Sequence, residues 1–465
     1  MSWTLIAKNY RGLREVAWSP QPGLNLLMGG NGAGKTTLLF VPAILRTALD
    51  RRRGLPAAIE AYGGHYDLKH LDAEPDQPIV LGVEHGGVRW ALEPTPNGSE
   101  RPAEQVWVSG RCVGRRAPGA TTAEVSFAEG VPWTPLPLPM DSVLQQVRNM
   151  AVGSFRTNDP TSLTNAPVGP LSELTDALAD FLLYYDPAVV RLRQQGSPAT
   201  GDTALDPDGD RAFSVLRNWR DRAKDRDRYD FVLDGLRACF DWFEDLEYEA
   251  SSTVVNARLI ERGYRGRSFG VRYAPNGWFR ALYNLAAVAS APEGGLVAVD
   301  EPENSLHPAA LRRLLDHVKD YAEELGLTVL FASQSETALD WVDPQHDRIW
   351  LMEGGRTPRP LSAVHDARWL NHFRLGELYR MEQLQGPAGG PSARGGTRRP
   401  YLEKEHGDRA MRALSVPEAT RPGPHAGYLR ALVDDVADML GVPSPASPGV
   451  LAPLTARPER LLRNL

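Results

Sequence analysis

The stretch that decides the fold is Gly29-Gly30-Asn31-Gly32-Ala33-Gly34-Lys35-Thr36, which fits the pattern G-x-x-x-x-G-K-[ST]. The apolar run 24–28 precedes it and predicts a buried strand, and the apolar positions of 37–53 predict a helix after it. Glycines allow successive backbone N–H groups to turn inward toward phosphate oxygens, and a helix N-terminus adds positive potential. The stretch therefore predicts a phosphate-binding loop between a strand and a helix.

This loop predicts a site for ATP and Mg²⁺. Lys35 is expected to reach the β- and γ-phosphates and to take part in catalysis, and the hydroxyl of Thr36 is expected to bind Mg²⁺. The competing interpretation is a glycine-rich turn with an incidental lysine. The residues of this region predicted to bind the nucleotide are Gly29, Asn31, Gly32, Ala33, Gly34, Lys35, Thr36 and Thr37.

A second motif far downstream argues against an incidental lysine. The apolar run 296–299 ends in Asp300 and Glu301. Two charges at the end of a strand that looks buried on both faces are costly without a cation. Asp300 is therefore expected to hold Mg²⁺, and Glu301 is expected to orient or deprotonate the attacking water. The alternative is an ordinary Asp-Glu-Pro turn.

Three further segments extend the pattern. Residues 275–280, Pro-Asn-Gly-Trp-Phe-Arg, precede an apolar helix expected over 281–290. Residues 303–308 follow the two carboxylates directly, and a strand expected at 328–332 ends in Ser-Gln-Ser, residues 333–335. Because Asn276 and Gly277 open a helix, they offer a site for an anion. Alone, residues 275–280 would be read as a plain turn.

The order of these motifs resembles the ABC-type ATPases, in which the P-loop is followed by a signature motif, a Walker B strand, a D-loop and a switch residue. Within that class the chain is most similar to the OLD-like and RecF-like ATPases of bacterial genome maintenance and phage defence. The matching segments are 8–12 (Lys-Asn-Tyr-Arg-Gly), 300–308 and 375–379 (Leu-Gly-Glu-Leu-Tyr). The resemblance implies an α/β fold: a mixed or parallel central sheet flanked by helices, an antiparallel sheet and a helical lobe.

The resemblance also implies roles for single residues. Arg11 would contact the nucleotide, and Asn276 and Gly277 would contact the γ-phosphate held by the other subunit of a homodimer. Gln334 stands at the switch position, where many relatives have His. Glutamine can hydrogen-bond a phosphate or water but cannot carry a proton charge. Asn276, or backbone N–H groups, must replace the usual serine, so slow turnover is expected.

The predicted organisation is an ATPase head over 1–386, a Gly/Pro/Arg-rich linker over 387–400 and a small helical extension over 401–465. Within the head we expect lobe I at 1–140, a helical insertion at 141–250 and lobe II at 251–386. Strand-like pieces at 78–83, 88–92 and 105–109 predict an antiparallel sheet. Other expected elements are helices over 141–195, 211–245, 309–325 and 425–440, strands at 328–333 and 348–353, and an arginine-bearing hairpin over 254–273. That hairpin is either an exposed face or, less favoured, a DNA-facing surface.

Composition narrows the class of protein. A net charge of −6 over 465 residues argues against indiscriminate coating of nucleic acid, although a local patch remains compatible with DNA binding. The two cysteines form no metal-binding or disulfide pattern. With no apolar run near the ~20 residues of a membrane span and no signal peptide, we expect a cytoplasmic chain without a membrane partner. Sustained heptads and a Toprim-like nuclease pattern are not found, so a nuclease effector, if one exists, is expected on another chain.

Three functions follow from this sequence. The first is an ATP-gated dimeric switch that controls a separate effector protein in anti-phage defence. The second is a RecF-like repair or recombination ATPase, for which DNA is the ligand. The third is a scaffold in which nucleotide is bound without turnover.

Overall fold

The computed structural model describes residues 2–50, 54–62, 64, 68–95, 101–127, 129–130, 132–137, 142–149, 167–263, 267–343, 346–364 and 375–380. Contacts divide the chain into two units, 1–386 and 387–465. The expected linker, the helix over 425–440 and the whole extension lie outside the described residues.

A six-stranded sheet forms the centre of the first unit, in the order β10-β15-β16-β3-β17-β18. Its first five strands are parallel and β18 is antiparallel. The strands are β3 (Gly23–Met28), β10 (Leu182–Tyr184), β15 (Leu296–Asp300), β16 (Thr328–Ser333), β17 (Arg348–Leu351) and β18 (Arg359–Pro360). Because β15, β16 and β3 are parallel neighbours, the segments that follow their carboxyl ends lie along one edge of the sheet.

Both faces of this sheet are buried, as the apolar runs predict. Successive side chains of a strand point to opposite faces. Leu26 and Met28 of β3 accordingly belong to one hydrophobic core, and Leu27 belongs to the other. Val297 and Val299 of β15 join the first core, and Ala298 joins the second.

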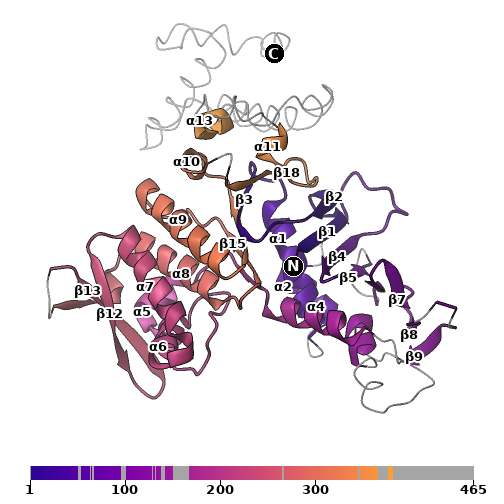
Figure 1. The fold of residues 1–465 in the computed structure, drawn as a ribbon, viewed down its shortest axis with the longest axis horizontal. Coiled ribbons are helices and arrows are strands. Elements are labelled where there is room, and N and C mark those ends of the chain that lie inside the picture. Colours follow the sequence, from indigo (N-terminus) through magenta and orange to yellow (C-terminus); the bar gives the residue numbers. More distant parts are fainter. Residues whose placement is uncertain are drawn as a thin grey trace, which may run out of the picture. The chain divides into compact units, whose positions relative to one another are not determined.

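The antiparallel sheet expected from 55–135 is present and larger than predicted. It has eight strands in the order β2-β1-β4-β5-β6-β7-β8-β9. Figure 1 shows it on one side of the central sheet with helices α1, α2 and α4. Its strands are β1 (Trp3–Tyr10), β2 (Leu13–Trp18), β4 (Val80–His85), β5 (Val88–Glu93), β6 (Ala103–Val108), β7 (Arg111–Arg116), β8 (Thr122–Val125) and β9 (Thr134–Pro137). The helices are α1 (Lys35–Ala48), α2 (Gly54–Ala61) and α4 (Val168–Asp180).

Most of the remaining helices lie on the other side, with a small sheet of β11, β13, β12 and β14 (Figure 1). The helices are α5 (Val189–Gln195), α6 (Ala212–Asp221), η1 (Ala223–Asp225), α7 (Arg226–Cys239), η2 (Val271–Tyr273), α8 (Asn276–Ser290) and α9 (Pro308–Glu324). The strands are β11 (Ser197–Pro198), β12 (Phe243–Ala250), β13 (Val254–Glu261) and β14 (Ser268–Gly270). Three short helices come later in the chain: α10 (Glu336–Asp340), α11 (Leu361–Val364) and α13 (Leu375–Arg380).

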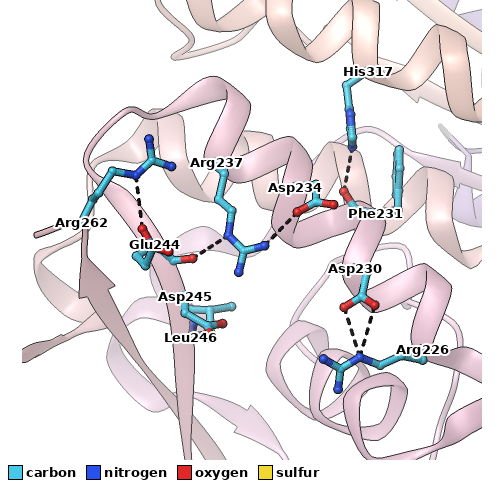
Figure 2. A network of polar contacts seen from close by, with 10 residues as sticks. All are labelled: Arg226, Asp230, Phe231, Asp234, Arg237, Glu244, Asp245, Leu246, Arg262 and His317. Carbon is cyan, nitrogen blue, oxygen red and sulfur yellow. Dashed lines mark hydrogen bonds and ion pairs between the residues drawn. The ribbon is translucent and has the colours of Figure 1, made fainter. Parts of the chain in front are cut away.

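Polar contacts hold the small sheet against α7, and Figure 2 shows this network. Arg237 of α7 donates to Asp234 at 2.8 Å and to the Glu244 carbonyl at 2.7 Å. Arg262 contacts the Glu244 carboxylate at 3.2 Å. Arg258, also at the predicted hairpin, donates to Ser268 at 2.9 Å. These local partners favour the exposed-face interpretation of the hairpin arginines.

The prediction of helices over 141–195 and 211–245 is wrong at two places, where the structure has strands. Residues 182–184 form β10, which pairs in parallel with β15, and residues 243–250 form β12, the antiparallel partner of β13. A three-residue apolar run is too short for its periodicity to separate strand from helix. The region 141–250 is therefore not wholly helical.

Candidate functional site

The P-loop residues have the backbone geometry that the motif predicts. Gly32 and Gly34 have φ values of 74° and 101°, in the left-handed region that favours glycine. A Cβ atom at Gly34 would lie 2.8 Å from Leu13. Helix α1 begins at Lys35, and the Lys35 ammonium donates to the carbonyls of Gly29 at 2.7 Å and Gly30 at 3.3 Å. The loop thus curls around the buried Lys35 ammonium. Burial lowers the pKa of Lys35, and the nearby carboxylates of Asp300, Glu301 and Glu303 act in the opposite direction.

Thr36 and Asp300 lie together, although they come from α1 and the end of β15. The Thr36 hydroxyl donates to Asp300 Oδ2 at 2.5 Å, while Asp300 Oδ1 is buried without a hydrogen-bond partner among the described residues. Burial raises the pKa of Asp300. A hydroxyl and an under-coordinated carboxylate beside a phosphate loop suit Mg²⁺, which takes oxygen ligands from one or two side chains, phosphate and water. The described part of the chain has no cluster of three or more His, Cys, Asp or Glu residues suited to a metal.

Glu301 and Gln334, the predicted catalytic carboxylate and switch residue, are in direct contact. Glu301 Oε1 accepts a hydrogen bond from Gln334 Nε2 at 2.9 Å, and Oε2 accepts one from Asn304 Nδ2 at 2.8 Å. Glu301 has a φ of 50°, a left-handed conformation that costs a residue with a Cβ atom about 1–2 kcal/mol. The contact exists because β16, which carries Gln334 after its end, lies next to β15.

Glu303 was not predicted as a site residue, yet it anchors the switch segment. Its Oε1 accepts from the Ser333 hydroxyl at 2.7 Å and from the Gln334 backbone N–H at 3.2 Å. Burial raises the pKa of Glu303. Its place inside the matching segment 300–308 was the signal that could have indicated it.

Asn276 and Gly277 open α8 as expected. Asn276 is exposed, and its Oδ1 accepts from Arg193 of α5 at 2.5 Å. A Cβ atom at Gly277 would lie 2.7 Å from the carbonyl oxygen of Ser305, so the backbone of α8 closely approaches the D-loop. Contact of these two residues with the γ-phosphate of a second subunit stays a prediction.

Arg11 lies in the β1–β2 turn and has a φ of 50°. Its guanidinium donates to the carbonyls of Tyr62 at 2.9 Å and Gly64 at 2.7 Å, after the end of α2. These bonds tie the turn to the segment after α2, and nucleotide contact by Arg11 stays a prediction. Among the other predicted residues, Asn31 is exposed and Ala33 and Thr37 are partly buried.

Arg280 and Asn284 of α8 were also missed as site residues. They donate hydrogen bonds to the backbone carbonyls of residues 300–302, the segment that carries the Asp300 and Glu301 carboxylates. The available signal was a pair of polar residues four positions apart on a helix that is otherwise almost entirely apolar.

Comparisons with known proteins found similarity to parts of this chain. A family model described as "AAA domain, putative AbiEii toxin, Type IV TA system" matches residues 272–340, which include α8, β15 and β16. The DNA replication and repair protein RecF of Heliobacterium modesticaldum (strain ATCC 51547 / Ice1) is 34% identical over 91 residues, 19% of this chain and 24% of RecF. The chain thus spans about a quarter of the length of that relative.

Two solved structures of Smc heads are similar at low sequence identity. An Smc head bound to the C-winged helix domain of ScpA has a TM-score of 0.45 and 11% identity, covering 78% of this chain and 99% of that chain. An Smc head with an extended coiled coil, bound to the C-terminal domain of ScpA derived from Pyrococcus furiosus, has a TM-score of 0.41 and 11% identity. The match covers 80% of this chain and 98% of that chain.

The P-loop between β3 and α1, with two carboxylates after β15, is the arrangement of an α/β fold that binds a nucleoside triphosphate. In parts of its length the chain is similar to the AAA family and to RecF. No helix within the described ranges combines the length and apolarity needed to cross a membrane.

Proposed function

We propose that this protein binds ATP with Mg²⁺ and hydrolyses it slowly. The observation that carries the proposal is the Glu301 carboxylate, held by Gln334 and Asn304 at the sheet edge where Thr36 meets Asp300. A carboxylate fixed in this way is suited to orient a water and to accept its proton. Its neighbours supply positioning and charge, which are the main requirements of phosphoryl transfer.

Each residue has one task in this mechanism. Lys35 neutralises the β- and γ-phosphate oxygens, and Glu301 takes the proton of the attacking water. Thr36 and Asp300 would hold Mg²⁺, which would supply positive charge against the charge that develops on the phosphates. Gln334 hydrogen-bonds Glu301 and orients it, but an amide cannot store a proton, which is consistent with slow turnover.

The second element of the proposal is a homodimer with composite ATP sites. The N-terminus of α8 presents exposed Asn276 and carries the positive end of the helix dipole, so it suits the γ-phosphate of a second copy. ATP that bridges two copies binds the dimer better than the monomer and therefore shifts the equilibrium between them. We propose that this shift gates a separate effector, such as a nuclease, in anti-phage defence. The match of residues 272–340 to a toxin-associated AAA family supports that context.

A DNA repair or recombination ATPase is the second candidate, favoured by the segment similar to RecF. In that case the ATP-dependent dimer binds DNA and not an effector protein. The third candidate, a nucleotide-bound scaffold, requires ATP binding without phosphate release.

The test uses the purified full chain. We expect Mg²⁺-dependent phosphate release and a larger species on a sizing column with ATP than with ADP. Thr36→Ala should abolish the Mg²⁺-dependent release, whereas Thr47→Ala, which removes another α1 hydroxyl that donates to the Ala43 carbonyl of its own helix, should not. Binding without any release would favour the scaffold. An effector that co-purifies would separate the switch from the repair ATPase, which should instead bind duplex DNA in an ATP-dependent manner.

A further inference from the structure

One face of α8 is bonded to the segment that carries the catalytic carboxylate. Arg280 donates through one guanidinium nitrogen to the carbonyl oxygens of Asp300, at 2.6 Å, and Glu301. Asn284 donates to the carbonyl oxygen of Pro302 at 2.8 Å. Residues four apart in a helix share a face, so three successive carbonyls, 300 to 302, are held by one side of α8.

The same face continues to the N-terminus of the helix. Gly277 lies three residues before Arg280, and its backbone packs so closely on the Ser305 carbonyl that a Cβ atom would lie 2.7 Å from the oxygen. The segment 300–305 is therefore in contact with α8 from its first turn to its third. A shift of the helix N-terminus would carry this segment with it, since closely packed elements move as units.

Arg280 is not explained by packing alone. The residue is 5% exposed and Asn284 is 0% exposed, on a helix whose other buried residues are nearly all apolar. A buried cation is costly unless it is paired or hydrogen-bonded. Arg280 lies in the electrostatic field of the Asp300, Glu301 and Glu303 carboxylates. It donates hydrogen bonds to the backbone carbonyls of the first two.

Three hydrogen bonds hold the unusual backbone of Glu301. Its N–H donates to the Ala332 carbonyl of β16 at 2.8 Å, and its own carbonyl accepts from Arg280 and from the Asn304 N–H at 3.2 Å. The φ of 50° is thus held from both sides, by β16 and by α8. This conformation aims the carboxylate at Gln334, which contacts it at 2.9 Å.

We propose that Arg280, supported by Asn284, is a positioning residue that couples the N-terminus of α8 to the Glu301 carboxylate. The inference rests on the proposed function, in which that N-terminus meets the γ-phosphate bound by a second copy. Engagement of the phosphate then sets α8, and Arg280 transmits the position of α8 to Glu301. Hydrolysis is in this way restricted to the assembled dimer.

The test begins with Arg280→Lys, which keeps the charge but loses the rigid planar donor group. We expect ATP affinity within about twofold of the wild type and single-turnover hydrolysis at least about tenfold slower. The matched control is Arg312→Lys on α9, where the arginine side chain is 53% exposed, and its rate should equal that of the wild type. Equal rates for Arg280→Lys and the wild type would overturn the inference and leave the ATPase proposal intact.

A double-mutant cycle separates positioning from a general structural role. If Arg280 acts through Glu301, then Arg280→Lys in a Glu301→Gln background should change the residual rate by less than about twofold. An equal tenfold loss in both backgrounds would overturn the inference. If Arg280→Lys does not fold, Asn284→Ala takes its place in the cycle, because it removes one hydrogen bond to the same segment.

A further measurement does not depend on turnover. In the nucleotide-free protein, Arg280→Lys should accelerate hydrogen exchange of the amides of Glu301 and of 303–305 by at least about tenfold, and Arg312→Lys should not. Unchanged exchange in this segment would contradict the coupling even if the wild type released no phosphate, a result that would separately refute the ATPase proposal.

Discussion

Glu301→Gln is expected to leave ATP bound and to slow its hydrolysis by about 10²–10⁴-fold. The amide keeps nearly the same shape as the carboxylate, but it cannot accept the proton of the attacking water. This loss corresponds to about 3–5 kcal/mol of activation free energy. The ATP-bound dimer should therefore accumulate.

The hydrogen bonds of Glu301 set the effect on stability. Its two oxygens accept from the amides of Gln334 and Asn304. A glutamine at this position has one oxygen and one NH₂ group, so one of those two partners must rotate its amide to present an oxygen. Exchanging two charge-assisted bonds for neutral ones costs about 1 kcal/mol each. Relief of repulsion with Asp300 and Glu303 offsets part of that cost, so the free energy of unfolding should fall by no more than about 2 kcal/mol.

The assay combines single-turnover hydrolysis, titration with a fluorescent ATP analogue and a sizing column. The matched control is Glu15→Gln on β2, where the carboxylate is 79% exposed and 3.9 Å from Lys8. The control should behave as the wild type in all three measurements. Turnover by Glu301→Gln at the wild-type rate would refute the assignment of Glu301 as the base, and loss of ATP binding would refute the argument that its amide partners adapt.

Three other perturbations test separate parts of the structure. Lys35→Ala should weaken ATP binding at least about 100-fold, measured by the same titration, because the charge that neutralises the phosphates is lost; unchanged affinity would mean that the P-loop is misassigned. Gly277→Asp, which places a Cβ atom 2.7 Å from the Ser305 carbonyl, should block hydrolysis and spare ATP binding. A mixture of Gly277→Asp and Lys35→Ala subunits forms one intact composite site, so activity should partly return, and no recovery despite subunit exchange would argue for a site within one subunit. Burial, and the nearby Asp210, raise the pKa of Asp206 to about 6. Because this value lies above the ordinary one of about 3.9, the stabilisation is complete below pH ~4 and is lost as the pH rises through about 6. Two pKa units correspond to at most about 3 kcal/mol, and partial exposure of Asp206 reduces this. In urea unfolding, Asp206→Asn should therefore gain stability relative to the wild type between pH 4 and pH 7.5, and a constant difference would contradict the shifted pKa.

The sequence by itself determined the parts of the site that lie in continuous stretches of chain. Residues 29–36 and the apolar run ending at Asp300 carry their chemistry in local order, because a glycine turn shapes its own backbone and a strand places the next residues at its end. The same holds for the helix that opens at Asn276, whose continuation is nearly all apolar. These stretches were sufficient to predict the phosphate-binding loop between a strand and a helix and the two carboxylates at the end of a second buried strand.

Only the tertiary structure decided which of these stretches meet. The hydrogen bond between Gln334 and Glu301 depends on β16 lying between β15 and β3. The order of strands in a sheet cannot be derived from the hydrophobic periodicity of any single strand. The edge strand β10 is a three-residue run, too short to be recognised before its pairing with β15 is known. In the sequence, Arg280 is marked only by its spacing from Asn284 on an otherwise apolar helix. Folding buries it against the carbonyls of Asp300 and Glu301, and the cost of a buried charge is set by the partners that folding brings to it.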